Sequence, residues 1–274
     1  MHNAIELIQR RVSVRTYSAQ PVEKEKLDAV SKFISELSGN PFGAKVRISL
    51  FESEASGRLG TYGFIRGANT YLAACVKKGE KDLEGLGYEF EEAVLYATSL
   101  GLGTCWVGGL FTRGAFAELM KPQDELLPVI SPLGYAAEKK SVVEKIVAAG
   151  AGSRKRKPNN ELFFDGDWTK PLDAQGNMLT CLEMVRLAPS ASNKQPWRAL
   201  RTESGLHFYM KKDNAYLGNK LGYCIQRIDM GIAACHLSLA AQQLGLNGAI
   251  VIDDPKLLGE AESSAGLYYS FSWR

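Results

Sequence analysis

Two long stretches of the chain carry apolar residues at the spacing of an α-helix. The apolar face of the first consists of Phe90, Ala93, Val94, Ala97 and Leu100. The second has Ala234, Leu237, Ala241 and Leu244 at matching offsets, with Ser238 interrupting the face. Gly101 and Gly245 follow directly, where a helix commonly ends in a left-handed residue. The pattern predicts two long apolar helices with glycine caps.

A shorter amphipathic helix is predicted upstream of each long one. The apolar positions are Leu27, Val30, Ile34 and Leu37 in the first case and Met178, Leu182 and Val185 in the second. Each follows a proline, Pro21 or Pro171. The order Pro-led helix, loop, strand, variable insert, long helix and strand therefore occurs twice. We interpret this order as a duplication, with a first half at 1–157, a second half at 158–274 and an exposed link at 148–160.

The composition is that of an ordinary globular protein, with 45% hydrophobic and 23% charged residues among 274. A net charge of +3 is too small and too dispersed to indicate a nucleic-acid partner. The cysteines are scattered and the histidines lack metal-ligand spacing, which argues against a disulfide framework and a zinc site. No apolar run approaches the roughly 20 residues that span a bilayer, so we expect a soluble cytoplasmic protein without a membrane partner.

Two arginines and a serine alternate near the N-terminus. Arg11, Ser13 and Arg15 occupy every second position, so an extended backbone would direct all three toward one ligand. A guanidinium group offers a planar fork of donors that suits phosphate. Arg154 and Arg156 show the same alternation in a Lys-rich link. The alternative for both segments is a solvated basic face.

The sequence APSASNKQPW at 188–197 combines two prolines with small hydroxyl and amide side chains. It lies between a helix-like run and a strand-like run. The prolines restrict the backbone, and the polar side chains present several hydrogen-bonding groups in that rigid frame. Such a loop suits a polar, flat ligand.

A glycine-rich loop, GLGTCWVGG at 101–109, follows the first long helix. Glycines allow backbone amides to approach a ligand closely, although a helix cap followed by a buried strand is the alternative. The loop matches neither the dinucleotide nor the Walker fingerprint. No nucleophile elbow or Ser-His-Asp set can be assembled. Loops that could cradle a ligand, without a protein nucleophile, indicate a cofactor that performs the chemistry.

These motifs together resemble those of the flavin-dependent nitroreductase family. The family's Arg-Arg-Ser-x-Arg-x-Phe/Tyr motif is similar to residues 11–17, with Val12 in place of the second basic residue. Its Ala-Pro-Ser-x-x-Asn-x-Gln-Pro-Trp motif is matched throughout 188–197. The resemblance implies an α+β, nitroreductase-like fold. The two similar halves resemble the single-chain tandem type, in which they form an intrachain pseudo-dimer.

The resemblance also implies one FMN, with each half supplying part of its site. Arg11, Arg154 and Arg156 would hold the phosphate, while Ser13 and Arg15 would contact the ribityl chain and the pyrimidine edge. A backbone amide of the glycine-rich loop would donate to ring N5. The complete set that the resemblance assigns to the cofactor is Arg11, Val12, Ser13, Arg15, Val107, Gly108, Gly109, Arg154, Arg156, Pro189, Ser190, Ala191, Ser192, Asn193 and Gln195.

Only one of the two pseudo-equivalent sites is expected to bind FMN. The places in the second half that match the arginine motif hold Glu161, Phe163 and Asp165. Acidic side chains therefore stand where an anion needs basic ones. One FMN per chain is the expected stoichiometry.

The resemblance implies an FMN-dependent oxidoreductase without a catalytic side chain. It would take hydride from NADH or NADPH and reduce a nitroaromatic or quinone-like small molecule by a ping-pong mechanism. Because the dimer would already be internal, we expect a monomer. Two alternatives stay open. One is a protein on the same fold that binds FMN or another anion for sensing, and the other is a different flavin reaction, such as flavin breakdown or dehalogenation.

Overall fold

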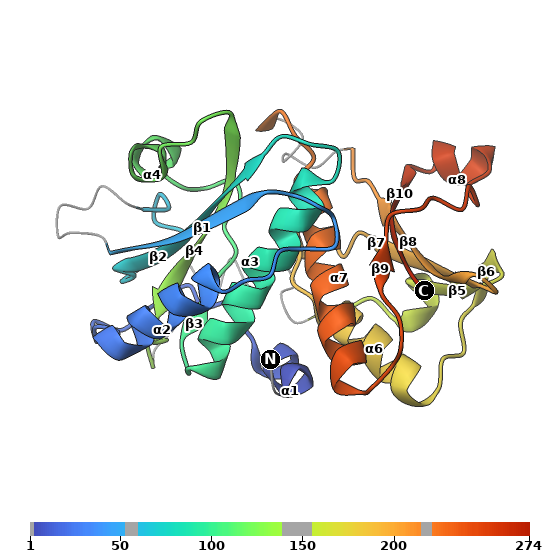
Figure 1. Cartoon of the computed structure of the whole chain (residues 1–274), viewed down its shortest axis with the longest axis horizontal. Helices are drawn as coiled ribbons and strands as arrows, with labels where there is room; N and C mark the ends of the chain where they lie inside the picture. The colour runs from blue at the N-terminus through green and yellow to red at the C-terminus, as the bar shows by residue number, and fades with distance from the viewer. Residues whose placement is uncertain (1–2, 53–59, 139–154, 215–220) are drawn as a thin grey trace. The chain divides into compact units, whose positions relative to one another are not determined.

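The computed structural model describes residues 3–52, 60–138, 155–214 and 221–274 (Figure 1). Contacts within the chain divide it into two compact units. The N-terminal unit is Arg10–Arg154, and the C-terminal unit consists of Met1–Gln9 together with Lys155–Arg274. The bounds of these units differ from those of the halves expected from the sequence, 1–157 and 158–274. The units are defined by contacts, whereas the halves are expected from the repeated order along the sequence.

The helix α1 (Ala4–Arg10) begins in the C-terminal unit, although the residues after it belong to the other one. The N–H of Ile5 donates to Oε1 of Gln243 at 3.0 Å. The apolar residues Ala4, Leu7 and Ile8 of α1 are buried. The C-terminal unit is therefore assembled from two separate stretches of the sequence.

An antiparallel sheet ordered β1-β2-β4-β3 forms the centre of the N-terminal unit. Its strands are β1 (Val46–Glu52), β2 (Thr70–Lys77), β3 (Gly103–Thr104) and β4 (Glu125–Gly134). The helices are α2 (Lys24–Ser35), α3 (Asp82–Ser99) and α4 (Arg113–Met120). Tyr71 of β2 and Ile130 of β4 lie in one buried cluster with Phe116 of α4. Leu133 of β4 lies in another with Leu27 of α2 and Ala97 of α3. α2 and α3 therefore cover one face of the sheet and α4 covers the other (Figure 1).

A sheet ordered β6-β5-β7-β8-β10-β9 forms the centre of the C-terminal unit. Its strands are β5 (Phe163–Asp165), β6 (Asp167–Pro171), β7 (Trp197–Thr202), β8 (Gly205–Lys211), β9 (Ile250–Val251) and β10 (Leu267–Trp273). The helices are η1 (Asn159–Glu161), α6 (Gly176–Leu187), η2 (Ala191–Asn193), α7 (Gln226–Gln243) and α8 (Glu260–Ser264). Among the described residues of both units, no helix has the length and apolarity needed to cross a membrane.

The two units repeat one arrangement of elements. The order along the chain is α2-β1-β2-α3-β3-α4-β4 in the N-terminal unit and α6-β7-β8-α7-β9-α8-β10 in the C-terminal unit. The neighbours within the sheets also correspond, because β1-β2-β4-β3 matches β7-β8-β10-β9. The repeated order predicted from the sequence is therefore confirmed in the fold. The strands β5 and β6 are additions to the C-terminal unit.

The two long helices end in the same way. Both α3 and α7 contain 18 residues, and they are followed by Gly101 with φ 78° and by Gly245 with φ 67°. The N–H of Leu102 donates to the carbonyl of Ala97 at 3.0 Å, and the end of α7 has the matching bond at 2.9 Å. These bonds define the Schellman motif, which confirms the predicted glycine caps. Leu37 lies beyond the end of α2, so its predicted place on that helix is wrong.

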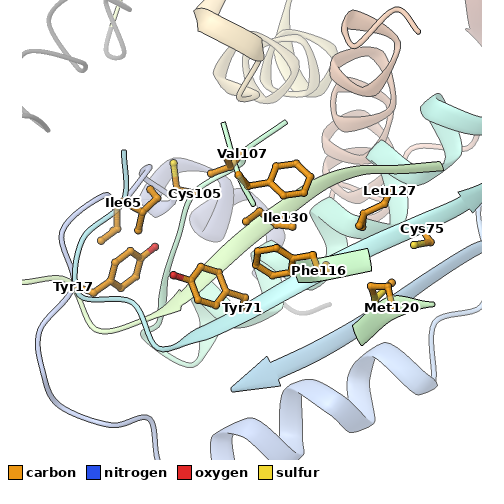
Figure 2. Close-up of a cluster of buried hydrophobic side chains, with 13 residues drawn as sticks. Tyr17, Ile65, Tyr71, Cys75, Cys105, Val107, Phe116, Met120, Leu127 and Ile130 are labelled. Atoms are coloured by element: carbon orange, nitrogen blue, oxygen red, sulfur yellow. The ribbon is translucent and has the colours of Figure 1, made fainter. Parts of the chain in front are cut away.

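A buried cluster anchors residues 11–17 of the N-terminal unit, which we call the arginine-bearing segment or arginine segment. Figure 2 shows Tyr17, Tyr71 and Phe116 among its side chains. Val14 of the same segment packs against Gly103, where an added Cβ would lie 2.7 Å from Cγ2 of Val14. A glycine at position 103 is therefore needed so that the segment can approach β3.

Candidate functional site

Backbone hydrogen bonds hold the arginine-bearing segment on two sides. The N–H of Val14 donates to the carbonyl of Thr104 at 2.8 Å. The N–H of Arg66 donates to the carbonyl of Arg15 at 2.9 Å, and that of Tyr17 donates to the carbonyl of Arg66 at 2.8 Å. The direction in which Arg15 leaves the backbone is therefore fixed by the fold.

The guanidinium group of Arg11 is buried beside a buried carboxylate. Its Nε lies 3.7 Å from Oε1 of Glu91, which belongs to α3. Glu91 also accepts a hydrogen bond from Nε1 of Trp106, at 2.7 Å from Oε2. Nε and Nη1 of Arg11 have no hydrogen-bond partner among the described residues. Glu91 thus compensates the charge of Arg11, while two of its nitrogens still lack acceptors.

Arg15 is buried as well, and no carboxylate of the described residues forms an ion pair with it. Its guanidinium carbon lies 5.6 Å from the ring centroid of Phe64. Within the same described ranges, its Nε has no hydrogen-bond partner. A ring face offsets a cation by only about 0.5–2 kcal/mol, whereas burying an unpaired charge is costly. An anion placed against this guanidinium would remove that cost.

These donors fit an anionic cofactor such as FMN. The orphaned nitrogens of Arg11 and Arg15 are the groups that a phosphate or the oxygens of the pyrimidine edge would satisfy. Ser13 lies between them in the sequence and is half-buried. The side chain of Val12 is 62% exposed, so the position that departs from the family motif lies at the surface.

The glycine-rich loop leaves two amides available. The N–H of Val107 donates to the carbonyl of Ile130 at 2.9 Å, and Ile130 returns the bond at 3.0 Å. The amides of Gly108 and Gly109 have no acceptor among the described residues. Of the three loop residues assigned to the cofactor, Gly108 and Gly109 therefore have N–H groups free to donate to a ligand.

The polar loop after α6 has a strained backbone. Ser192, Asn193 and Gln195 have φ angles of 48°, 55° and 50°, a region that costs a non-glycine residue about 1–2 kcal/mol. Ser190 holds this shape, because its Oγ accepts the N–H of Gln195 at 2.9 Å and its carbonyl accepts the N–H of Asn193 at 2.9 Å. Strain of this kind is common in segments that bind ligands.

The amide side chains of this loop bind the basic segment at 155–157. Nδ2 of Asn193 donates to the carbonyl of Lys155 at 2.8 Å. Oε1 of Gln195 accepts the N–H of Lys157 at 2.8 Å, and Nη1 of Arg156 donates to Oδ1 of Asn193 at 3.1 Å. Both amides therefore order the basic segment, a role that the sequence does not reveal.

Arg156 also binds the end of α6. Its Nη2 donates to the carbonyl of Leu187, the last residue of that helix, at 3.2 Å. A cation at this position satisfies a carbonyl that the helix leaves open and complements the helix dipole. Arg154, the other predicted phosphate contact in this segment, lies outside the described residues. Arg11 belongs to the N-terminal unit and Arg156 to the C-terminal one.

A buried carboxyl group absent from our sequence predictions supports the polar loop. Oδ1 of Asp229 in α7 accepts the N–H of Ala191 at 2.9 Å. Its Oδ2 is buried and has no hydrogen-bond partner in the described part of the chain. Burial raises the pKa of Asp229 well above its usual range, and the bond from Ala191 opposes this shift. Its position between Ile228 and Met230, inside an apolar helical stretch, is the feature of the sequence that could have indicated its burial.

We expect Asp229→Asn to flatten the pH dependence of the unfolding free energy. The raised pKa means that the native state keeps a proton that the unfolded chain loses above about pH 4. The free energy of unfolding of the parent protein should therefore fall as the pH rises above that value. The variant carries no titrating group at position 229. Its free energy of unfolding, measured by urea denaturation, should therefore rise relative to that of the parent between pH 4 and pH 8. Asp173→Asn, at an exposed site, is the control, and parallel curves for Asp229→Asn and the parent would contradict the prediction.

Comparison with known families identifies the chain. A sequence model of the family described as "Putative TM nitroreductase" matches residues 3–241. The chain belongs to this family. The arginine segment, the glycine-rich loop and the polar loop all lie inside the range that the TM nitroreductase family covers. A search of curated proteins finds no match.

One solved structure supports the fold of the TM nitroreductase family in this chain. A putative nitroreductase from Thermotoga maritima matches with a TM-score of 0.61 at 23% identity, covering 92% of this chain and 89% of that one. This likeness confirms the predicted α+β, nitroreductase-like fold. A nitroreductase family protein from Clostridium difficile matches with a TM-score of 0.43 at 20% identity, over 57% of this chain and 94% of its own. A nitroreductase with bound FMN from Bacteroides fragilis matches with a TM-score of 0.42 at 18% identity, over 52% of this chain and 92% of its own.

Proposed function

We propose that this protein is an FMN-dependent NAD(P)H oxidoreductase that reduces nitroaromatic or quinone-like small molecules. The observation that supports this most directly is the pair of buried guanidinium groups on one extended segment. Nitrogens of Arg11 and Arg15 have no hydrogen-bond partner among the described residues, so the segment is suited to an anionic ligand. Family membership supports the oxidoreductase class.

In this proposal the residues that the sequence motifs assign to FMN bind one cofactor per chain. Arg11 would bind the phosphate together with Arg154 and Arg156. Ser13 and Arg15 would contact the ribityl chain and the pyrimidine edge, where a cation stabilises negative charge on the ring. When bound, FMN supplies the hydride-transfer chemistry, and the side chains of the protein bind and orient it.

We assign the contact to ring N5 to the glycines of the glycine-rich loop. The amides of Gly108 and Gly109 lack an acceptor among the described residues, whereas that of Val107 is bonded to Ile130. The polar loop would line the cofactor with its rigid backbone and hydroxyl groups, from Pro189, Ser190, Ala191 and Ser192. Its amides, Asn193 and Gln195, would act mainly by holding the segment at 155–157 in place.

The first test is the absorption spectrum of the purified protein, followed by mass analysis of any compound released by heat. We expect flavin bands and about one FMN per chain. Two per chain would contradict the argument that the second site has lost its basic residues. A colourless protein that takes up no added FMN would overturn the proposal.

Steady-state kinetics separate an enzyme from a binding protein. Oxidation of NADH or NADPH in the presence of a nitrofuran or a naphthoquinone should follow parallel double-reciprocal lines, as a ping-pong mechanism requires. Bound FMN without turnover would favour the sensing alternative. Light scattering during gel filtration should give the mass of one chain, because both halves of the proposed pseudo-dimer are in that chain.

A further inference from the structure

A pocket with a volume of about 240 Å³ lies between α8 and the sheet of the C-terminal unit. The rings of Phe164 and Trp168 line it from β5 and β6, and Arg198 and Lys211 line it from β7 and β8. None of these residues belongs to the set that we propose for FMN. The pocket is therefore separate from the residues proposed for FMN.

The repeat explains why this pocket exists. α4 is the counterpart of α8, and its Phe116 and Met120 are 0% and 2% exposed. The ring of Phe116 lies 5.4 Å from that of Tyr71 on β2. α8 is shorter and has no buried residue, and the apolar side chains that it and its C-cap contribute to the pocket are the small ones of Ala261 and Ala265. The space that large side chains fill in the N-terminal unit is therefore left open in the C-terminal one.

Aromatic rings form one wall. Phe164 and Trp168 meet edge to face with ring centroids 5.6 Å apart, and Trp168 packs on Tyr209 at 5.1 Å. Nε1 of Trp168 is buried without a hydrogen-bond partner among the described residues. Both pocket rings come from β5 and β6, the strands that have no counterpart in the N-terminal unit. Offset or edge-to-face packing on these rings suits a further aromatic ring.

Positive charge forms the other wall. Arg198 is buried, and none of the described carboxylates lies within ion-pair distance of it. Burial lowers its pKa, and the charge of Glu161 opposes that shift. Its Nη1 donates to the carbonyls of Trp197 at 2.7 Å and Gln195 at 3.1 Å. The exposed Lys211 adds a second cation. Glu262 also lines the pocket, but its Oε2 accepts the N–H of Gly259 at 3.0 Å as part of the N-terminal cap of α8.

We propose that this pocket binds a small aromatic carboxylate with one ring. The ring would pack against Phe164 and Trp168, and the carboxylate would face Arg198 and Lys211. A cavity of about 150 Å³ accommodates benzene, so this volume leaves room for one ring and its acid group. The inference does not depend on the proposed reaction or on bound FMN.

The test is calorimetric titration of the whole protein with benzoate. We expect saturable binding, at least about tenfold tighter than the binding of benzamide, the neutral analogue. Ala265→Phe should abolish binding because it fills the space, as Phe116 does in the other unit. Ser263→Phe places the same bulk on an exposed position of α8 and should leave binding unchanged. Ala261→Leu is a second filling variant that keeps the test valid if Ala265→Phe does not fold.

Three results would overturn the inference. They are equal affinity for benzoate and benzamide, benzoate binding unchanged in a folded filling variant, and inorganic phosphate binding as tightly as benzoate. Retention of benzoate binding in Arg15→Met would support the inference, because that variant alters the arginine segment only. Loss of benzoate binding in Arg15→Met would assign the ligand to that segment and would also overturn the inference.

Discussion

Replacement of Arg15 by methionine should weaken FMN binding about 10- to 100-fold while leaving the FMN-free protein as stable as the parent or more stable. A hydrogen bond to a charged group contributes about 1.5–3 kcal/mol, which sets the loss of affinity. The side chain of Arg15 is buried, and its contact with the ring of Phe64 is the only described interaction of its guanidinium group. Removing an unpaired buried charge is neutral or favourable for folding. Affinity and stability should therefore change in different directions.

Arg11→Met should behave differently from Arg15→Met, because Arg11 lies beside a buried carboxylate. The carboxylate of Glu91 is fully buried and lies 3.7 Å from Nε of Arg11. Removing the guanidinium group takes away the cation beside that buried carboxylate, whereas the hydrogen bond from Trp106 remains. Breaking a buried pair in this way costs about 3–5 kcal/mol, so this variant should lose both FMN and stability. Arg66→Met, at an exposed position, should change neither.

The measurements are FMN titration by fluorescence quenching and urea denaturation of the FMN-free protein. Unchanged FMN affinity in Arg15→Met would remove Arg15 from the proposed site. Equal destabilisation in Arg15→Met and Arg11→Met would show that Arg15 has a partner equivalent to Glu91.

Gly67→Ala should lower the free energy of unfolding by about 2–5 kcal/mol, as the sum of two effects. Gly67 has φ +77°, and an added Cβ would lie 2.5 Å from the carbonyl oxygen of Tyr17. The backbone of Tyr17 would have to move. Because the neighbouring Arg66 bonds to the carbonyl of Arg15, we also expect weaker FMN binding.

Gly63→Ala is the matched control for this substitution. Gly63 has φ +80°, but no atom lies within 4 Å of an added Cβ. It should incur only the backbone penalty of about 1–2 kcal/mol. The difference between the two variants in urea denaturation isolates the contact with Tyr17. Equal losses would mean that the chain accommodates the contact without cost.

Local signals in the sequence were sufficient to predict the repeated order of elements. Helical periodicity and a following glycine depend only on neighbouring residues, and the ends of α3 and α7 match the prediction. The order of strands in a sheet depends on pairing between distant segments, so the additions β5 and β6 could not be predicted. The short helices α4 and α8 follow the long helices, beyond the predicted repeat order, and no periodic pattern identified them.

The candidate site was predictable by residue type and less so by role. Arg11 and Arg15 are buried donors that lack partners, as an anion site requires. The sequence could not show that the amides of Asn193 and Gln195 are already bonded to the segment at 155–157. Glu91 and Asp229 were missed because a carboxylate on a helix is usually solvated, and only the packing shows that these two are buried.

The split composition of the C-terminal unit constrains the order of folding during synthesis. Arg10–Arg154 is one continuous stretch, so the N-terminal unit can form while the ribosome is still producing the rest of the chain. α1 is made before this stretch, but its partner Gln243 emerges much later. Until α7 is complete, the apolar side chains of α1 have no place in their own unit. Although α1 is made before the N-terminal unit, its residues are therefore among the last to reach their native contacts.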